Sequence, residues 1–385
     1  MNKPIPYGRQ NITEEDIKVV VEALQHDFLT QGPKIAEFEN EFSKYIGCKY
    51  SVALANGTAA LHLAAIALGV DETSTVLTTP ITFAASANCI KYCGGKIDLV
   101  DVDPETGLMS IPALKAKLES KPKGTYQGVI PVDLSGYPVD LEEVRILADE
   151  FDIWILEDSC HAPGGFFIDS KGVKQKCGNG NYANAAIFSF HPVKHIASGE
   201  GGMITTNDKD LYEKLLILRT HGITKNQDLM EENHGGWYYE MQMLGYNYRL
   251  TDFQAALGIS QLKRAEANLD KRRAIALRYD EELRNLDVII PKEKFGHAYH
   301  LYAIKSKDRK GLYDFLKSKQ IYAQVHYIPI HFLPYYKNLG LKKGDYPNAE
   351  AYYSKCLSLP MYPTLTDEEQ GYVIEQVLEY EKVIA

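Results

Sequence analysis

The sequence lacks the patterns that mark several large classes of protein. It contains no run of 18 apolar residues, so a membrane-spanning helix is not expected. The first nine residues include no apolar segment of the kind found in secretory signal peptides, and we expect a cytoplasmic protein. The net charge of −9 argues against general nucleic-acid binding, because neutralising phosphates requires a basic face.

Cysteine is scarce, and its spacing gives no metal-binding pattern. The six cysteines form no C-x-x-C pair, and Cys89 and Cys93 lack a second pair of ligands. We therefore expect free thiols in a reducing cytosol and no metal site. There is no P-loop, H-E-x-x-H or G-x-S-x-G motif. Residues 178–183 match G-x-G-x-x-A, but they follow the charged stretch 171–176 rather than a strand, so a dinucleotide site is not expected.

Alternating strand and helix patterns fill the first two thirds of the chain. This alternation implies crossover connections and an α/β fold, with a mostly parallel sheet that helices cover on both faces. A length of 385 residues favours two domains. We predict a large domain over 1–265 and a smaller C-terminal α+β domain over 266–385. The predicted strands lie at 51–55, 75–79, 96–102, 128–133, 153–157, 185–190 and 202–205.

Several helices can be predicted from their ends. Thr13 is a candidate N-cap, and Pro33 is suited to the first turn of a helix that reaches about Tyr45. Asn56 to Thr58 open an Ala/Leu-rich helix that Gly69 can end. The long helical pattern over 251–286 predicts one continuous helix as a spine between the domains. The chain then ends in an amphipathic helix near 368–380.

Two residues carry the chemistry that pyridoxal phosphate (PLP) requires. Asp158 ends the apolar run 153–157, and Lys194 lies 36 residues later, before a glycine-rich turn. A lysine amine can bind the aldehyde of PLP, and a buried aspartate can keep the pyridine nitrogen protonated. The alternatives are a solvated surface lysine and an aspartate that caps a helix.

Other segments are candidates for the cofactor site. The helix start at 56–59 offers free amides and a favourable dipole to a phosphate, and Gly57 permits close approach; a plain helix cap is the alternative. Ser189 is a second phosphate donor. Phe83 follows a strand and can stack on a pyridine ring, although such residues are more often core. His161 is either a cofactor contact or a loop histidine.

The combined motifs resemble one family over nearly the whole chain, from about residue 4. That family is the PLP-dependent nucleotide-sugar aminotransferases of the DegT/DnrJ/EryC1/StrS group, which have the type I aminotransferase fold. The motifs that carry the resemblance are 56–59, 79–83, 157–161, 189–194, 200–202 and 245–249.

The resemblance implies a role for each matching residue. Lys194 binds PLP covalently, Asp158 pairs with the pyridine nitrogen, and Phe83 covers the ring. Gly57, Thr58, Ala59 and Ser189 hold the phosphate, and His161 contacts the cofactor. Asn247 reaches the phosphate from the other subunit of a homodimer with shared active sites. The residues expected to face the nucleotide sugar are Tyr7, Asp27, Phe28, Leu29, Thr30, Arg249, Gln324, Val325, His326, Tyr327 and His331.

Within the family, the segments 27–32, 191–194, 219–223 and 324–327 look most like the pseudaminic-acid branch. The expected reaction is amination of C4 of a UDP-linked 4-keto-6-deoxy-N-acetylhexosamine, with L-glutamate as the donor. Another UDP- or dTDP-4-keto sugar is an alternative substrate. Two further function classes stay open: a PLP-family sugar dehydratase, which carries histidine instead of the lysine, and a non-catalytic nucleotide-sugar binding protein. The role of 225–240 also stays open.

Overall fold

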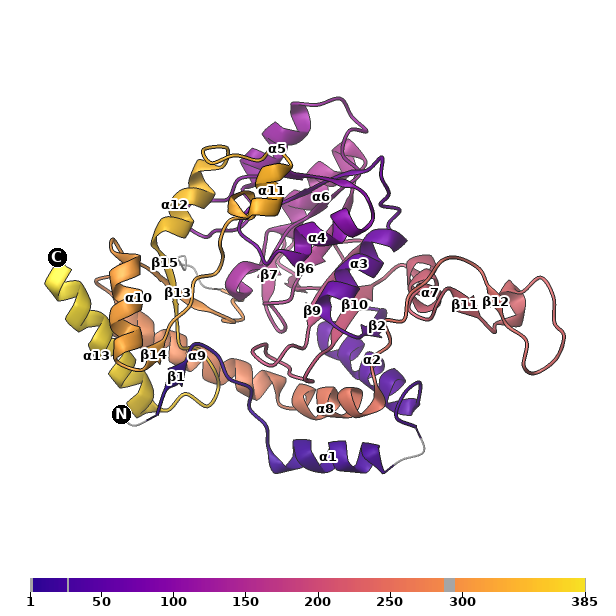
Figure 1. Cartoon of the computed structure of the whole chain (residues 1–385), viewed down its shortest axis with the longest axis horizontal. Coiled ribbons are helices and arrows are strands. Elements are labelled where there is room, and N and C mark those ends of the chain that lie inside the picture. Colours follow the sequence, from indigo (N-terminus) through magenta and orange to yellow (C-terminus); the bar gives the residue numbers. More distant parts are fainter. Residues whose placement is uncertain (1–2, 26–27, 287–294, 385) are drawn as a thin grey trace.

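The structure is a computed structural model that describes residues 3–25, 28–286 and 295–384. A seven-stranded sheet forms its centre (Figure 1). Only β10 runs antiparallel to its neighbours in this sheet; the other pairs are parallel, which confirms the predicted α/β class. The strand order is β2 (Tyr50–Leu54), β10 (Gly202–Thr206), β9 (Ala185–Ser189), β6 (Trp154–Asp158), β5 (Gly128–Ile130), β3 (Thr75–Thr78) and β4 (Lys96–Leu99).

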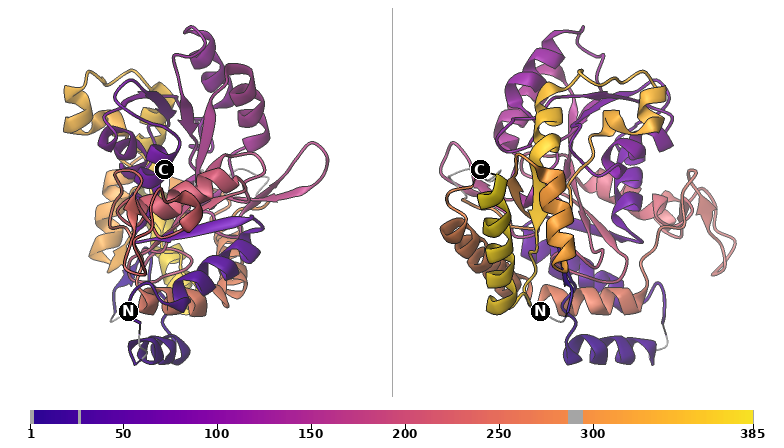
Figure 2. Two further views of the ribbon diagram at one scale, coloured as in Figure 1. Left: turned by 90° about the vertical axis from the view of Figure 1, so that its right-hand side faces the viewer. Right: turned by 60° about the vertical axis from the view of Figure 1, so that its left-hand side comes forward.

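Helices cover both faces of the sheet because successive strand residues point to opposite sides. On β9, Ile187 packs with α3 (Gly57–Ala67), α4 (Ala85–Tyr92) and α7 (Lys209–Leu218). The next residue, Phe188, belongs to the opposite core with α2 (Pro33–Ile46) and α8 (Asp252–Leu262). Leu77 and Val129 extend that opposite face to α5 (Ile111–Glu119) and α6 (Leu141–Phe151). The layers are visible in Figure 2.

The predicted helix starts are confirmed. Thr13 forms a capping box with Asp16 at the start of α1 (Glu14–Leu24), and Pro33 occupies the first turn of α2. The Asn56 side chain accepts a hydrogen bond from the Ala59 amide at the start of α3. Gly69, just beyond this helix, has a φ of +86°, a conformation that glycine adopts without strain.

The prediction of one continuous spine helix over 251–286 is wrong. The chain forms α8 and then α9 (Ala265–Glu282), with a turn at Lys263 and Arg264. At this turn the Arg264 guanidinium binds the Asp16 carboxylate of α1. The side-chain periodicity could not show the break, because the sequences on both sides of it are helical.

A smaller core surrounds the C-terminal elements. It includes Ile5, the C-terminal half of α9 and the residues after 299. We propose that the boundary between the two domains lies at 265/266, because the break between α8 and α9 comes just before it. Two segments cross it: β1 pairs with β14, and α11 and α12 pack on the core beside α5 and α6. The elements are β1 (Ile5–Pro6), β13 (Tyr302–Lys305), α10 (Arg309–Ser318), β14 (Ile321–Tyr322), α11 (Pro334–Asn338), α12 (Pro347–Lys355), β15 (Cys356–Leu359) and α13 (Asp367–Ile384).

An extended arm leaves the body of the molecule after α7 (Figure 1). Its stem is the pair β11 (Ile223–Thr224) and β12 (Glu240–Met241), and its segment 225–240 is the one whose role stayed open. Large side chains are exposed along the arm and just after it, among them Trp237, Met241 and Leu244.

The charged stretch before residue 178 differs from the prediction. Residues 174–176 form a short strand, β8 (Lys174–Lys176), paired with β7 (Phe166–Ile168), so the expectation of no strand before 178 is wrong. The residues after 178 lead into β9 and not into a helix. The motif over 178–183 therefore lacks the helix that a dinucleotide-binding motif opens. All six cysteines lie in the described part and are unpaired there. Within the described residues, none of the helices combines the length and apolar character of a membrane span.

Candidate active site

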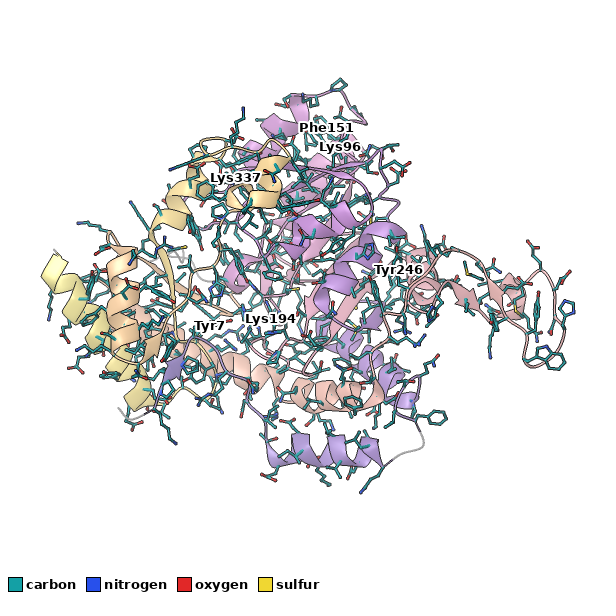
Figure 3. All side chains as sticks on the ribbon, in the orientation of Figure 1. Tyr7, Lys96, Phe151, Lys194, Tyr246 and Lys337 are labelled. Atoms are coloured by element: carbon teal, nitrogen blue, oxygen red, sulfur yellow. The ribbon has the colours of Figure 1, made fainter. Side chains whose placement is uncertain are left out.

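A cavity of about 700 Å³ opens beside the carboxyl ends of the central strands. This is the edge where open parallel sheets bind ligands. Tyr7 and Lys194, labelled in Figure 3, both line this cavity. Eleven of the predicted site residues line the cavity: Tyr7, Gly57, Thr58, Ala59, Phe83, Asp158, His161, Ser189, Lys194, His326 and Tyr327.

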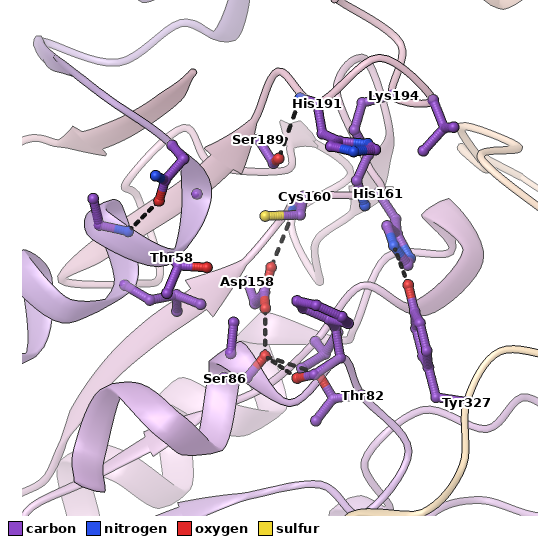
Figure 4. Close-up of a pocket in the computed structure, with 18 of the residues that line it drawn as sticks. Thr58, Thr82, Ser86, Asp158, Cys160, His161, Ser189, His191, Lys194 and Tyr327 are labelled. Atoms are coloured by element: carbon purple, nitrogen blue, oxygen red, sulfur yellow. Dashed lines mark hydrogen bonds between the residues drawn. The ribbon is translucent and has the colours of Figure 1, made fainter. Parts of the chain in front are cut away.

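Asp158 is a buried carboxylate at the end of β6 and borders the cavity (Figure 4). Its Oδ2 accepts a hydrogen bond from the Ser86 hydroxyl at 2.7 Å, and its Oδ1 accepts one from the Cys160 amide at 3.2 Å. A buried carboxylate stays ionised where donors and a nearby cation compensate for lost hydration. The cavity therefore offers a fixed negative charge to a cationic group.

Lys194 is the cation of this site. It lies in the turn after β9, where its amide donates to the His191 carbonyl at 2.8 Å. Burial lowers the pKa of the Lys194 amine, while Cys160 and Asp158 oppose that shift. A lowered pKa increases the fraction of neutral amine, which is the form that attacks a carbonyl and accepts a proton.

Three histidines around the cavity, His161, His300 and His326, have lowered pKa values because they are buried. Burial, followed by the Lys194 charge, lowers the pKa of His326 to about 3 and that of His161 well below its usual value. The His161 Nδ1 accepts a hydrogen bond from the Ser135 amide at 3.2 Å, so its proton lies on Nε2. That Nε2–H donates to the Tyr327 hydroxyl at 3.1 Å, which leaves the tyrosine proton free to bind a ligand.

The N-terminus of α3 and Ser189 face each other across a narrow space. A Cβ atom at position 57 would lie 3.0 Å from the Ser189 Cβ, so glycine keeps the two elements close. The Ala59 amide already donates to Asn56 at 2.8 Å. The first-turn amides of Gly57 and Thr58 and the hydroxyls of Thr58 and Ser189 are the donors best placed for an anion.

Phe83 lies on the loop before α4, with 60% of its surface exposed. Its ring centroid is 6.1 Å from that of Tyr327, so two aromatic side chains border the same opening. An exposed ring of this size at a cavity wall is suited to stacking on a flat ligand.

Other predicted residues lie outside the cavity in the described part of the chain. Asn247 is exposed and forms a backbone bridge to Thr220, whereas its neighbour Tyr248 lines the cavity and binds His62 at 3.1 Å. This extended segment therefore turns Asn247 and Arg249 away from the site of their own chain. Asp27 lies outside the described residues. Apart from His331, the other predicted site residues that are described but do not line the cavity are Phe28, Leu29, Thr30, Gln324 and Val325.

The side chains of residues 28–30 are exposed. The Leu29 carbonyl accepts a hydrogen bond from the Asp252 amide at the start of α8. Gln324 is exposed and pairs with Ser358 through its backbone, and Val325 packs between two cores. Their substrate contacts stay predictions.

The structure does not place His331 among the residues that line the cavity. This side chain is fully buried, and its Nε2 lies 3.1 Å from a carboxylate oxygen of Glu350. The short 3₁₀ turn over Ile330–Phe332 directs it into the core against Tyr346. The motif Pro-Ile-His gave no indication of which way the turn would point.

Lys194 and His195 are adjacent in the sequence, and the structure shows which of them lines the cavity. Lys194 lines the cavity, whereas the neighbouring His195 is buried and its Nε2 donates to the Ala298 carbonyl at 2.7 Å. A histidine in the lysine position, the mark of a sugar dehydratase, is therefore absent from the described cavity wall at this point.

Sequence reasoning missed several residues of the site. Thr82, Ser86, Tyr248 and His300 all line the cavity. Ser86 binds Asp158 although 72 residues separate them, and a single serine in an Ala-rich helix carries no local signal of that contact. Tyr248 could have been found, because it lies between Asn247 and Arg249 in one of the family motifs.

Comparison with known proteins agrees with this geometry. Residues 10–378 match the model of the DegT/DnrJ/EryC1/StrS aminotransferase family. The chain belongs to this family. It is 37% identical to the UDP-4-amino-4,6-dideoxy-N-acetyl-beta-L-altrosamine transaminase of Campylobacter jejuni, over 96% of the chain and 95% of that protein.

Solved structures of relatives share the fold over almost the whole chain. PseC of Helicobacter pylori, an aminotransferase involved in the biosynthesis of pseudoaminic acid, superposes with a TM-score of 0.88 at 30% identity, over 99% of this chain and 100% of PseC. The PLP form of the putative sugar aminotransferase Spr1654 of Streptococcus pneumoniae gives 0.89 at 29% identity, with the same coverage. The present DegT-family chain is a PLP-dependent sugar aminotransferase with the type I fold.

The residues of this structure fit PLP. The Asp158 carboxylate borders the cavity where a pyridinium nitrogen needs an anionic partner, and Lys194 supplies an amine with a lowered pKa. The glycine at 57 leaves space that any side chain would fill. Donors around that space suit a phosphate, and Phe83 offers an aromatic face.

A second acidic group lies on the opposite face of β6 from Asp158. The nearest ligand atoms of Asp133, Glu157 and Cys177 lie within 4.8 Å of one another, and all three residues are buried. The Asp133 oxygens accept hydrogen bonds from the Val139 amide and the Ser159 hydroxyl.

The Glu157 Oε2 accepts one from the Gly178 amide, and its Oε1 has no partner among the described residues. Two buried carboxylates this close disfavour each other's ionised form, and we predict that the pair shares one proton. Burial, and then the Asp133 charge, raise the pKa of Glu157 well above its usual value. Burial also raises the pKa of Asp133 to about 6.

We predict that this pair makes stability depend on pH. Because both folded pKa values lie above the unfolded ones, the pair's contribution is complete below about pH 4 and is lost as the pH rises through 6 and beyond. In Glu157→Gln, an amide N–H replaces the shared proton at every pH. The free energy of unfolding should then fall less between pH 5 and pH 8 than in the wild type, by on the order of 1–3 kcal/mol.

Denaturant unfolding at the two pH values measures this difference. Glu150→Gln, on the exposed end of α6, removes a charge without touching the pair and should keep the wild-type pH dependence. An unchanged pH dependence in Glu157→Gln would show that the two carboxyls do not share a proton.

Proposed function

We propose that the chain transfers the amino group of L-glutamate to C4 of UDP-2-acetamido-2,6-dideoxy-β-L-arabino-hexos-4-ulose, in pseudaminic acid biosynthesis. The observation that carries the transamination is the cavity shared by Lys194 and Asp158. The sugar assignment is supported by the 37% identity to the altrosamine transaminase over almost the whole of both chains.

The chemistry divides between cofactor and protein. Bound PLP supplies the aldehyde that carries the amino group and a ring that withdraws electrons from the amino-acid Cα. Asp158 holds a negative charge at the ring nitrogen and so favours its protonated form. With glutamate in the site, the freed Lys194 amine would remove the Cα proton as a base and then return a proton as an acid.

The two substrates use the site in turn. Glutamate would leave as 2-oxoglutarate, with a water molecule supplying its keto oxygen and the amino group retained in the site. The keto sugar would then enter, take up that amino group and lose its keto oxygen as water, with Lys194 moving the protons in both halves. The aromatic and polar side chains at the mouth are suited to a nucleotide sugar. Tyr7 lies with its ring centroid 5.2 Å from that of His326, and the Tyr327 hydroxyl has a proton to donate.

Rival functions have less support. A dehydratase requires a histidine where Lys194 lines the cavity, and His195 is engaged with Ala298 instead. A non-catalytic binding protein has no need of a lysine beside a buried carboxylate. Another UDP- or dTDP-4-keto sugar is the strongest rival substrate, because residue types do not fix which epimer a pocket prefers. The cytoplasm is the compartment that we propose for this reaction.

The substrate proposal predicts the outcome of a competition assay. The holoenzyme receives glutamate and equal amounts of the UDP-linked L-arabino and D-xylo 4-keto sugars, and the products are identified by mass spectrometry and NMR. We expect the L-arabino sugar to be aminated at least about 10-fold faster, a preference of about 1.4 kcal/mol. Lys194→Ala is the control without turnover. Faster amination of the D-xylo sugar, or amination of neither, would refute the sugar assignment and leave the family assignment intact.

We also propose that two copies of the chain complete each active site. Asn247 is exposed and turned away from the cavity of its own chain. The nearby arm exposes Trp237, Met241 and Leu244, and such apolar side chains are typical of a surface that another protein covers. In a homodimer, Asn247 would reach the phosphate group in the site of the other subunit.

Subunit mixing tests this arrangement. Lys194→Ala and Asn247→Ala each abolish or greatly reduce activity if both residues are needed. In a mixed dimer the two defects fall in one site, and the other site is intact, so up to about a quarter of wild-type activity should return on random exchange, by mass action. Lack of recovery, with exchange proven by two affinity tags, would place Asn247 in the site of its own subunit.

A further inference from the structure

We propose that Ser86 and Thr82 are positioning residues, which form a directed hydrogen-bond chain that orients the Asp158 carboxylate toward the cofactor ring. The proposal rests on the role of Asp158 in the proposed function. It adds Ser86, which lies outside the sequence motifs, and Thr82, which lies within the motif 79–83 but had no role assigned to it.

The contacts are short and buried. The Ser86 hydroxyl lies 2.7 Å from the Asp158 Oδ2, and the Thr82 hydroxyl lies 2.8 Å from that of Ser86 (Figure 4). None of the three side chains exposes more than 6% of its surface. All three border the cavity, so the chain of hydrogen bonds lies in its wall.

The direction of the chain follows from the number of protons. A carboxylate only accepts hydrogen bonds, so the Ser86 hydroxyl must donate its single proton to Asp158. The other acceptor near Ser86, the Phe83 carbonyl, is at 3.4 Å and is the weaker partner. Ser86 is thereby left as an acceptor, and the proton between the two hydroxyls comes from Thr82. Each donor in the chain points toward Asp158.

This arrangement fixes both the charge and the orientation of the carboxylate. A hydrogen bond to an ionised group is shorter and about twice as strong as one between neutral groups, and it favours the ionised form. The Cys160 amide holds the Oδ1 at 3.2 Å, so both oxygens are restrained from the protein side. Asp158 also lines the cavity, so the restrained carboxylate borders the space in which the ring would lie.

The position of the chain in the fold links it to the cofactor face. Thr82 and Phe83 lie on the loop that leads into α4, and Ser86 lies in the first turn of that helix. Phe83 is the aromatic residue predicted to cover the ring. One segment of five residues therefore carries both the ring-covering side chain and the groups that orient Asp158. A shift of this segment would move the two together.

A buried hydroxyl can also serve stability alone, and the chain offers a matched control for that role. Thr78, on β3, is equally buried, and its hydroxyl donates to the Ile130 carbonyl at 2.9 Å. This hydroxyl is therefore engaged away from Asp158, and Thr78 is not among the residues that line the described cavity. Thr78→Val removes a hydroxyl of the same kind, four residues away from Thr82.

The experiment compares Ser86→Ala, Thr82→Val, Thr82→Ser and Thr78→Val as holoenzymes reconstituted with PLP labelled with ¹⁵N in the ring. The rate of the reaction with glutamate alone, the ¹⁵N chemical shift of the ring nitrogen and the melting temperature are measured. We expect Ser86→Ala to slow this half-reaction by roughly 10- to 100-fold, as small losses of alignment do, and to move the ring nitrogen toward its deprotonated shift.

Thr82→Val should change the rate and the chemical shift in the same direction, but less. Thr82→Ser keeps the hydroxyl and should show the wild-type rate and chemical shift. Thr78→Val should lower the melting temperature without moving the rate or the chemical shift. An unchanged chemical shift and rate in Ser86→Ala would overturn the proposal, as would an equal loss of rate in Thr78→Val.

Failure of the underlying function gives a different result. If Asp158→Asn leaves the ring nitrogen unchanged, then Asp158 is not its partner, and the proposed role of the carboxylate fails first. The identity of the sugar has no influence, because the assay contains only glutamate.

Discussion

The pairing of a buried negative charge with a lysine amine is the constraint on which the rest of this structure depends. Asp158 ends β6, and Lys194 follows β9, the neighbouring strand of the sheet. Adjacent parallel strands end at the same edge, so the two charges meet although 36 residues separate them. Burial lowers the pKa of the Lys194 amine, and the nearby Asp158 carboxylate opposes that shift. The donors to the Asp158 carboxylate are the Ser86 hydroxyl, from the helix α4 that follows β3, and the Cys160 amide, just after β6 itself.

The surroundings of this pair keep other charges away. His161, His300 and His326 have pKa values lowered by burial, so they are neutral at physiological pH and act through hydrogen bonds. On the opposite face of β6, burial and then the Asp133 charge raise the pKa of Glu157, the group that we predict shares a proton with Asp133. Three successive residues, Glu157 to Ser159, thus alternate between the shared-proton pair and the cavity, as the side chains of a strand must. The end of β6 therefore borders two acidic groups, Asp158 on the cavity side of the sheet and the Asp133–Glu157 pair on the other side.

Much of this could be predicted from the sequence. The order of apolar runs indicated the α/β class, and Thr13, Pro33 and Asn56 marked true helix starts, because these signals are local. Other features depend on contacts between distant segments. The break between α8 and α9 lies where Arg264 meets α1, the His331 side chain turns into the core, and Ser86 reaches Asp158 across the sheet. A single sequence shows the residue types in such contacts but not the partners.

Covalent labelling of the lysine tests the central claim most directly. The purified protein is incubated with PLP, reduced with borohydride, digested and mapped by mass spectrometry. We predict a single stoichiometric phosphopyridoxyl group on Lys194, which prior reaction with glutamate would prevent by converting the cofactor to its amine form. Labelling of an exposed lysine such as Lys174, or of none, would contradict the assignment of Lys194 as the residue that binds the cofactor.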